Sequence, residues 1–297
     1  MSDESVLPRY RSAEFLLLIV VIIWASNFPI AKYGIRGLDI FVFNGIRYLS
    51  AFIAVALIFR LRGKWKDVHS SDWRKMIGVG FLAHVVYQLA FIVGLKLTTA
   101  GNSAILLATS PLWTVFLSAR MHKEAIPFQT WMGMVLSLVG IATIIVASGR
   151  EVEFGSSAIL GDLITLLAAL LWALNTNMQK PLLVHHSSMQ LTVVMVAVGA
   201  VAHTLFSLPD ALTMSWGDTH PTYFLAAVVS GALTIGVGNV LWSYGVKRIG
   251  PSRTANVSNL TPVLAFIISY LTLNEAVSLL HVVGGAVTIM GIWIARR

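Results

Sequence analysis

The chain has 297 residues, of which 57% are hydrophobic and only 11% are charged, and its mean hydropathy is +0.79. Soluble domains are close to a quarter charged, so this composition excludes a soluble protein and indicates a membrane protein. The formal net charge of +8 raises the question of a nucleic-acid partner, and the absence of Cys excludes disulfides, thiolate metal sites and Cys nucleophiles.

Apolar runs recur from end to end, and about 20 such residues are enough for one helical crossing of a bilayer. The sequence predicts ten spans, approximately over residues 15–35, 40–60, 74–95, 99–120, 127–147, 161–183, 188–209, 222–246, 252–273 and 278–295. The connections are too short to fold as soluble domains. The first run is followed by Lys32 rather than by a small-residue cleavage site, so we expect it to remain in the mature protein.

The positions of the Lys and Arg residues predict the topology. If the N-terminus is cytoplasmic, the outer side holds only Lys32, Arg36, Lys96 and Arg150, Arg47 lies inside the second span, and all the other basic residues lie on the inner side. This asymmetry follows the positive-inside rule and predicts cytoplasmic termini in an inner (cell) membrane. The basic charge therefore indicates orientation in a lipid bilayer and no nucleic-acid partner.

An internal repeat divides the chain. The stretch IIWASNFPIAK at 22–32 aligns with LLWALNTNMQK at 170–180, and the alignment continues through later segments. The pairs include Trp24 with Trp172, Asn27 with Asn175, His84 with Ile235, Pro111 with Pro262, and Glu124 with Glu275. Two halves, 1–150 and 151–297, would each hold five helices. Because five is odd, the second half must enter the membrane from the opposite side, which predicts inverted repeats of the kind found in secondary transporters.

Two segments carry a resemblance to a known family. Both SARMHKEAIPFQTWMGMVLSLVG and SYLTLNEAVSLLHVVGGAVTIMG follow a Pro-containing span with a Glu and then a Gly-x6-Gly helix. This duplicated pattern resembles the EamA-type branch of the drug/metabolite transporter (DMT) superfamily. The resemblance implies an all-α fold of ten helices, with helices 1–4 and 6–9 around a central cavity and the fifth and tenth to one side. It also implies export or exchange of small metabolites, and the chain is most similar to the bacterial exporters of amino acids, including aromatic ones.

Polar residues inside the spans suggest where a substrate would bind. Asn27 needs a hydrogen-bond partner in hydrocarbon, and Pro29 frees a backbone carbonyl that protein or water must satisfy. Inter-helix bonding or a wet cavity would meet both needs. His84, Tyr87 and Gln88 share one helical face, and the repeat maps that face onto Asn239 and Trp242. Such stripes often serve helix packing, but their recurrence favours a binding wall.

The predicted substrate-binding residues are Trp24, Asn27, His84, Tyr87, Gln88, Trp172, Asn175, Asn239 and Trp242. Pro29, Pro111 and Pro262 are predicted kinks or hinges. Arg47 would either meet a substrate carboxylate or extend to the nearer membrane surface. Glu124 and Glu275 are expected to cap helices or pair with cations, and His203 receives no predicted role.

All thirteen acids lie near helix ends or in loops, so no carboxylate proton relay is expected and His84 is the main titratable candidate. This favours neutral or zwitterionic cargo. No catalytic motif is present, so we predict no enzyme, no metal and no cofactor. The expected partner is a small amino-acid-like substrate, moved by alternating access. Drugs or nucleotide-linked sugars remain alternative cargo, a channel remains an alternative mechanism, and the sequence leaves the oligomeric state open.

Overall fold

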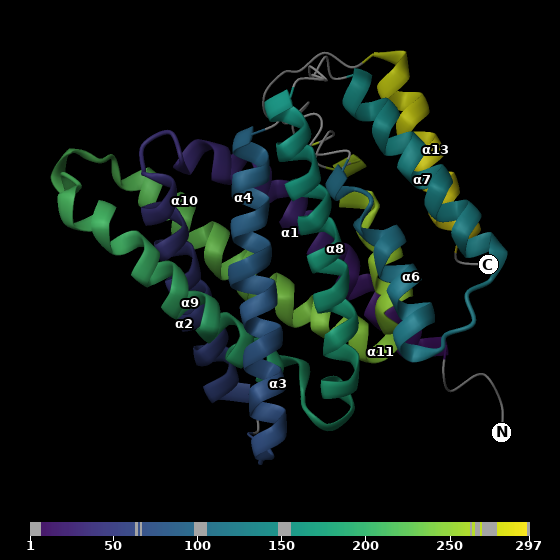
Figure 1. The fold of residues 1–297 in the computed structure, drawn as a ribbon, viewed down its shortest axis with the longest axis horizontal. Coiled ribbons are helices and arrows are strands. Elements are labelled where there is room, and N and C mark those ends of the chain that lie inside the picture. The colour runs from purple at the N-terminus through teal and green to yellow at the C-terminus, as the bar shows by residue number, and fades with distance from the viewer. Residues whose placement is uncertain are drawn as a thin grey trace. The chain divides into compact units, whose positions relative to one another are not determined.

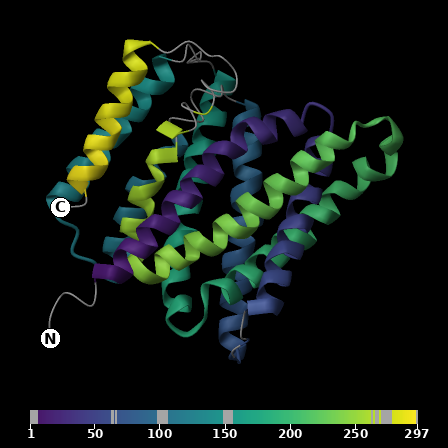
Figure 2. The same cartoon turned by 180° about the vertical axis from the view of Figure 1, so that it is seen from behind.

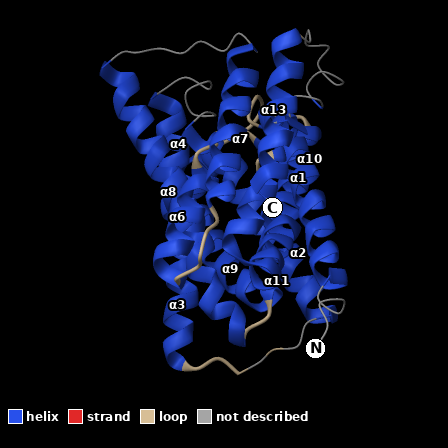
Figure 3. Cartoon of the chain, turned by 90° about the vertical axis from the view of Figure 1, so that its right-hand side faces the viewer, coloured by secondary structure: helices blue, strands red, loops and turns tan. Residues whose placement is uncertain are grey.

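The computed structural model describes residues 7–62, 65, 67–97, 106–147, 156–261, 263, 264, 268 and 278–295. Every regular element in these ranges is a helix, as Figure 3 shows, so the predicted all-α class is confirmed for the described chain. Within the described residues, five stretches are long and apolar enough to cross a membrane: Ala13–Ala31, Ile40–Leu61, Ile159–His185, Ser188–Thr213 and Pro221–Ser258. Phe128–Thr143 and Val282–Ala295 are shorter apolar helices. The full set of ten spans, their inversion and the sidedness of the termini stay predictions.

The chain forms two compact units, and the first comprises Met1–Val85 and Pro181–Arg248. Its elements, shown in Figure 1, are α1 (Leu7–Gly34), α2 (Ile40–Arg62), α3 (Ser70–Phe81), most of the π-helix η2 (Leu82–Val86), α9 (Ser188–Thr213), the 3-10 helix η3 (Trp216–Asp218), α10 (Pro221–Ser230), the π-helix η4 (Gly231–Val237) and the start of α11 (Gly238–Ser258). α2 packs along α9. Buried side chains from α2, α9 and η4, including Tyr48, Val196 and Ile235, form one core of this unit.

The second unit comprises Val86–Lys180 and Ile249–Arg297. It contains α4 (Tyr87–Leu97), α6 (Ser110–His122), α7 (Phe128–Ala147), most of α8 (Ser156–His185), the end of α11 and α13 (Leu279–Ala295). α7 and α13 lie side by side in Figures 1 and 2.

The Gly-x6-Gly motif explains why α7 and α13 pack so closely. A Cβ atom added at Gly133 would lie 2.4 Å from the carbonyl oxygen of Gly291, and one added at Gly140 would lie 2.6 Å from that of Gly284. Small residues let helix backbones approach in a membrane, where close packing replaces the hydrophobic effect as the source of association. The hydroxyl of Ser137 also donates to the carbonyl oxygen of Thr288 at 3.3 Å.

Two helix boundaries lie next to Pro residues. The predicted break between the eighth and ninth spans is confirmed at Gly250, whose φ of 83° interrupts α11 immediately before Pro251. Gly tolerates positive φ, and Pro fits the first turn of a helix because its missing N–H would be unbonded there. In the fourth span, a turn at 108–109 precedes α6, so Pro111 lies in the first turn of that helix. Its role as a hinge stays a prediction.

The boundaries between the units lie at or near a π-helix, a Pro and a Gly with positive φ. One falls between Val85 and Val86 at the end of η2. Another falls before Pro181, which lies inside α8, and the third falls after Arg248, two residues before Gly250.

Candidate functional site

The predicted polar stripes are associated with two π-helical segments. η2 contains His84 and leads directly into Tyr87 and Gln88 of α4, and η4 contains Ile235 and leads into Asn239 and Trp242 of α11. The predicted repeat aligns His84 with Ile235, and each of these residues lies in a π-helix. π-Helical turns are rare and are frequent at functional sites.

In the first unit, Trp24 contacts Trp242. Asn27 lies one turn after Trp24 on α1, and Asn239 lies one turn before Trp242 on α11. The rings of Trp24 and Trp242 have centroids 5.1 Å apart and are inclined by 35°. Trp24 Nε1 donates to the carbonyl oxygen of Thr234 at 3.4 Å. We call these residues of α1, η4 and α11 the Trp24 cluster; Trp242 is almost fully buried, whereas Trp24 and Asn27 are half-buried.

The two Asn residues of the Trp24 cluster have different partners. Asn27 Oδ1 accepts a hydrogen bond of 2.5 Å from the hydroxyl of Ser230 on α10, which joins α1 to α10. Asn239 is buried, and its Nδ2 donates to the carbonyl oxygen of Ile235 at 2.9 Å. Asn27 therefore makes the inter-helix bond that a membrane Asn requires through its Oδ1 atom. The Nδ2 atom of this half-buried side chain is a further hydrogen-bond donor.

His84 lies in a buried aromatic cluster of the first unit. The hydroxyl of Tyr48 lies 3.4 Å from His84 Nδ1, and the Tyr48 ring stacks on His203 with centroids 4.2 Å apart. His203 Nε2 donates to the carbonyl oxygen of His84 at 2.8 Å. His84 Nε2 is buried and has no hydrogen-bond partner within the described ranges. Sequence reasoning gave His203 no role, because a single His in an apolar run shows no periodic pattern.

In the second unit, Tyr87 of α4 contacts Trp172 of α8, with ring centroids 5.3 Å apart, and stacks on Phe91. Asn175 is buried and lies one helical turn beyond Trp172. Its Oδ1 accepts a hydrogen bond of 3.3 Å from Gln179 Nε2. Asn175 Nδ2 is also buried, and no described residue accepts its hydrogen bonds. We call these residues the Trp172 cluster. Gln88 is half-buried on α4, one residue after Tyr87.

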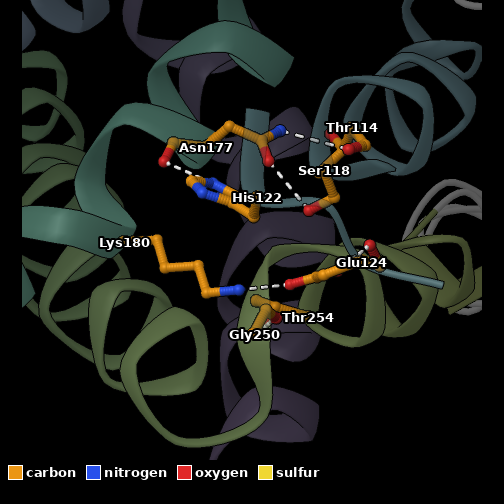
Figure 4. A network of polar contacts seen from close by, with 9 residues as sticks. Thr114, Ser118, His122, Glu124, Asn177, Lys180, Gly250 and Thr254 are labelled. Atoms are coloured by element: carbon orange, nitrogen blue, oxygen red, sulfur yellow. Dashed lines mark hydrogen bonds and ion pairs between the residues drawn. The ribbon is translucent and has the colours of Figure 1, made fainter. Parts of the chain in front are cut away.

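A polar network in the second unit was not predicted as a whole. Figure 4 shows Asn177 of α8 between Ser118 and His122 of α6. Asn177 Oδ1 accepts from Ser118 at 2.8 Å, and its Nδ2 donates to the carbonyl oxygens of Thr114 and Ala173. His122 Nε2 lies 3.1 Å from the carbonyl oxygen of Asn177, so this nitrogen must carry the proton and donate. Every hydrogen-bonding atom of the Asn177 amide is therefore engaged.

Glu124 extends this network beyond the end of α6. Its carboxylate pairs with Lys180 of α8 and accepts a hydrogen bond of 3.1 Å from Ser252, which begins the helical segment after Gly250. A carboxylate near a helix N-terminus is favoured by the helix dipole. The expectation that Glu124 caps a helix or pairs with a cation is confirmed; its repeat partner Glu275 lies outside the described residues.

The environment of the network sets its protonation. Burial alone would raise the pKa of the Glu124 carboxyl, but the hydrogen bond and charge of Lys180, with a hydrogen bond from Ser252, outweigh burial and hold that pKa below its usual value. Burial and the Lys180 charge lower the pKa of the His122 imidazole. At neutral pH the network therefore contains an ionised Glu124 and a neutral His122.

The predicted hinge residues occupy different surroundings. Pro29 lies inside α1, Pro111 in the first turn of α6, and Pro262 outside the described residues.

Arg47 is on α2, where its guanidinium donates to Asn44 Oδ1 at 3.0 Å and lies 5.5 Å from the centre of the Phe43 ring. No group of three or more His, Cys, Asp or Glu side chains suited to a metal ion occurs among the described residues.

The chain is similar over nearly its whole length to several transporters. An uncharacterised transporter of Archaeoglobus fulgidus is 31% identical over 94% of this chain and 95% of its own length. A probable terminal-alkyne amino-acid exporter of Streptantibioticus cattleyicolor is 27% identical over 97% and 95% of the two chains. A probable amino-acid metabolite efflux pump of Salmonella typhimurium is 25% identical over 96% and 94%.

One solved crystal structure has the same fold, with a TM-score of 0.82, 19% identity and coverage of 96% of this chain and 98% of its own. The model of the EamA-like transporter family matches residues 11–146 and again residues 159–297. The chain belongs to the EamA-like transporter family.

Proposed function

We propose that this transporter exports small amino-acid-like metabolites, including aromatic amino acids, across the inner membrane by alternating access. Two relatives whose names refer to amino-acid export support the cargo. The Trp24 and Trp172 clusters support it physically, because each pairs large aromatic rings with side-chain amides. Such a lining suits a ligand with one apolar body and a few polar groups.

The observation that carries the proposal is the Nδ2 atom of Asn175. A buried donor without a partner costs about 1–3 kcal/mol, and such groups are rare in native proteins. Asn175 lies one turn from Trp172 on the same face of α8, and its Oδ1 is already held by Gln179. A substrate carboxylate or carbonyl accepting from Nδ2 would remove this cost while its apolar part contacts Trp172 and Tyr87.

The proposal is tested by efflux from proteoliposomes. Vesicles holding the purified protein and preloaded with labelled Phe or Thr should release the label faster than vesicles without protein, and external unlabelled substrate should accelerate release by exchange. Replacing Asn175 by Ala should slow efflux about two- to tenfold, because one hydrogen bond to the substrate is lost. Trp172→Ala should slow it as well, whereas Trp216→Ala, at an exposed residue of η3, should leave it unchanged. Efflux of both amino acids at the rate of empty vesicles would refute the cargo, and release without saturation or exchange would indicate a channel.

A further inference from the structure

An apolar groove on the first unit lies between α3 and α9. Trp73 and Ile77 of α3 form one side, Val193, Ala197 and Val201 of α9 contribute to the other, and the groove has a volume of about 450 Å³. Ile77 and Val201 are about half exposed or more. From Val193 to Val201 the groove follows α9 for about 12 Å, given the rise of a helix per residue. Its shape and chemistry suit a hydrocarbon chain.

Two Trp residues close one end of this groove. Trp65, in the α2–α3 connection, stacks on Trp73 in the first turns of α3, with ring centroids 5.8 Å apart, and Phe59 meets the Trp65 ring edge-on at 5.4 Å. Trp residues collect at the level of lipid headgroups, where an apolar ring with a polar N–H is most favourable. The aromatic pair therefore places the groove's end at the membrane surface and the α9 side chains deeper.

Two basic residues flank the aromatic side chains at this end. Arg60 follows Phe59 on α2, and Arg74 follows Trp73 on α3. Arg60 and Arg74 are exposed, and neither makes a hydrogen bond or ion pair with the part of the chain that the structure describes. Asp72, two residues before Arg74, is already engaged, because it pairs with Lys75 at 3.2 Å and with His186 at 3.1 Å. The guanidinium groups of Arg60 and Arg74 are thus available to an anion at headgroup level.

We propose that this groove binds a glycerophospholipid with a net negative headgroup, whose acyl chain lies along α9 and whose phosphate is bound by Arg60 and Arg74. A zwitterionic lipid fills the groove equally well but gains less from the basic side chains. Each Lys or Arg near an anionic membrane surface contributes about 1 kcal/mol, or about fivefold in binding. The inference concerns a surface separate from the Trp24 and Trp172 clusters and does not depend on the cargo.

The test uses Trp quenching by brominated lipids. The full chain is reconstituted in phosphatidylcholine vesicles, and brominated phosphatidylglycerol or brominated phosphatidylcholine is added at equal mole fraction. The difference in quenching between the natural chain and the double variant Trp65→Phe/Trp73→Phe reports on the groove. We expect a relative affinity at least about fivefold higher for phosphatidylglycerol, falling to about one in Arg60→Gln/Arg74→Gln.

A second groove of the same unit supplies a matched control. It lies between α2 and the α10–η4 segment, has a volume of about 380 Å³, and is lined by Leu49, Ile53, Val228 and other uncharged residues. The nearby Arg47 already donates to Asn44 Oδ1. In the Trp65→Phe/Trp73→Phe background, an Ile53→Trp reporter should be quenched equally by the two lipids. Three outcomes would overturn the proposal. The two lipids could quench the α3–α9 groove equally, the preference for phosphatidylglycerol could survive the double Arg substitution, or the same preference could occur at Ile53→Trp.

Discussion

Trp24 of α1 and Trp242 of α11 lie ring against ring, 5.1 Å between centroids, although one is half-buried and the other is 1% exposed. Removing a fully buried Trp side chain costs about 3–5 kcal/mol of stability, because burial is lost and a cavity remains. We expect Trp242→Ala to lower the free energy of unfolding by this amount and Trp24→Ala by clearly less. Thermal unfolding followed by circular dichroism in detergent measures both. Trp216→Ala, at an exposed Trp, is the control, and equal losses at Trp24 and Trp242 would contradict the assignment.

Asn175 should contribute to the affinity for substrate, and bound substrate should raise the free energy of unfolding. Phe at about 100 times its Kd should stabilise the natural chain by about 2.7 kcal/mol, since the ligand binds only the folded state. In Asn175→Ala the ligand loses one hydrogen bond of about 0.5–1.5 kcal/mol, so its affinity should fall about two- to tenfold. Calorimetric titration measures the affinity. The variant Thr143→Ala on α7 should bind Phe as the natural chain does, and an unchanged affinity in Asn175→Ala would exclude this residue from the binding site.

The pairing of Glu124 with Lys180 predicts a pH dependence. The folded pKa of Glu124 lies below its unfolded value, so the carboxylate contributes stability that is complete above the unfolded pKa of about 4.3 and is lost as pH falls through the lower folded value. Glu124→Gln should therefore cost up to about 1 kcal/mol at pH 7, as for partly exposed pairs, and progressively less below about pH 4. Melting temperatures of both proteins at pH 7 and pH 3.5 test this sign. A difference that grows on acidification would contradict it.

The contact of α7 with α13 predicts different effects for two Gly residues of α13. A Cβ atom at Gly291 would lie 2.5 Å from the backbone nitrogen of Ser137, whereas the nearest atom to one at Gly285, among the described residues, is in Val263 at 3.9 Å. Gly291→Ala should force the helices apart and lower stability by about 1–3 kcal/mol. Gly285→Ala should be neutral or raise stability by up to about 1 kcal/mol, because Ala favours the helix. Chemical or thermal unfolding distinguishes them, and similar values for both would show that the contact is not tight.

Helix positions could be predicted from local patterns, but their internal geometry could not. The Gly250–Pro251 pair marks a boundary because each residue has its own backbone preference. The segment Leu82–Val86, in contrast, reads as an ordinary apolar helix. Its π-helical hydrogen bonding shifts the pattern by a single residue, and packing against other helices decides between the two forms.

For the candidate site, the sequence indicates which residues are unusual in a membrane, but it does not predict which residues they contact. Asn27 and Trp242 stand out as polar or amphipathic residues of repeated stripes. Ser230, which donates to Asn27, does not stand out, because Ser is common in membrane spans and this one belongs to no periodic pattern. Lys180 likewise lies far along the chain from Glu124, and only the packing of α6, α8 and α11 brings the charges together.

The chain passes from one compact unit to the other at Val85–Val86, Lys180–Pro181 and Arg248–Ile249. A π turn, a Pro without an N–H and a Gly with positive φ mark these passages, so the regular i to i−4 ladder is already interrupted at or beside each of them. Bending the chain at these passages would therefore break fewer helical hydrogen bonds than bending it in the middle of a regular helix.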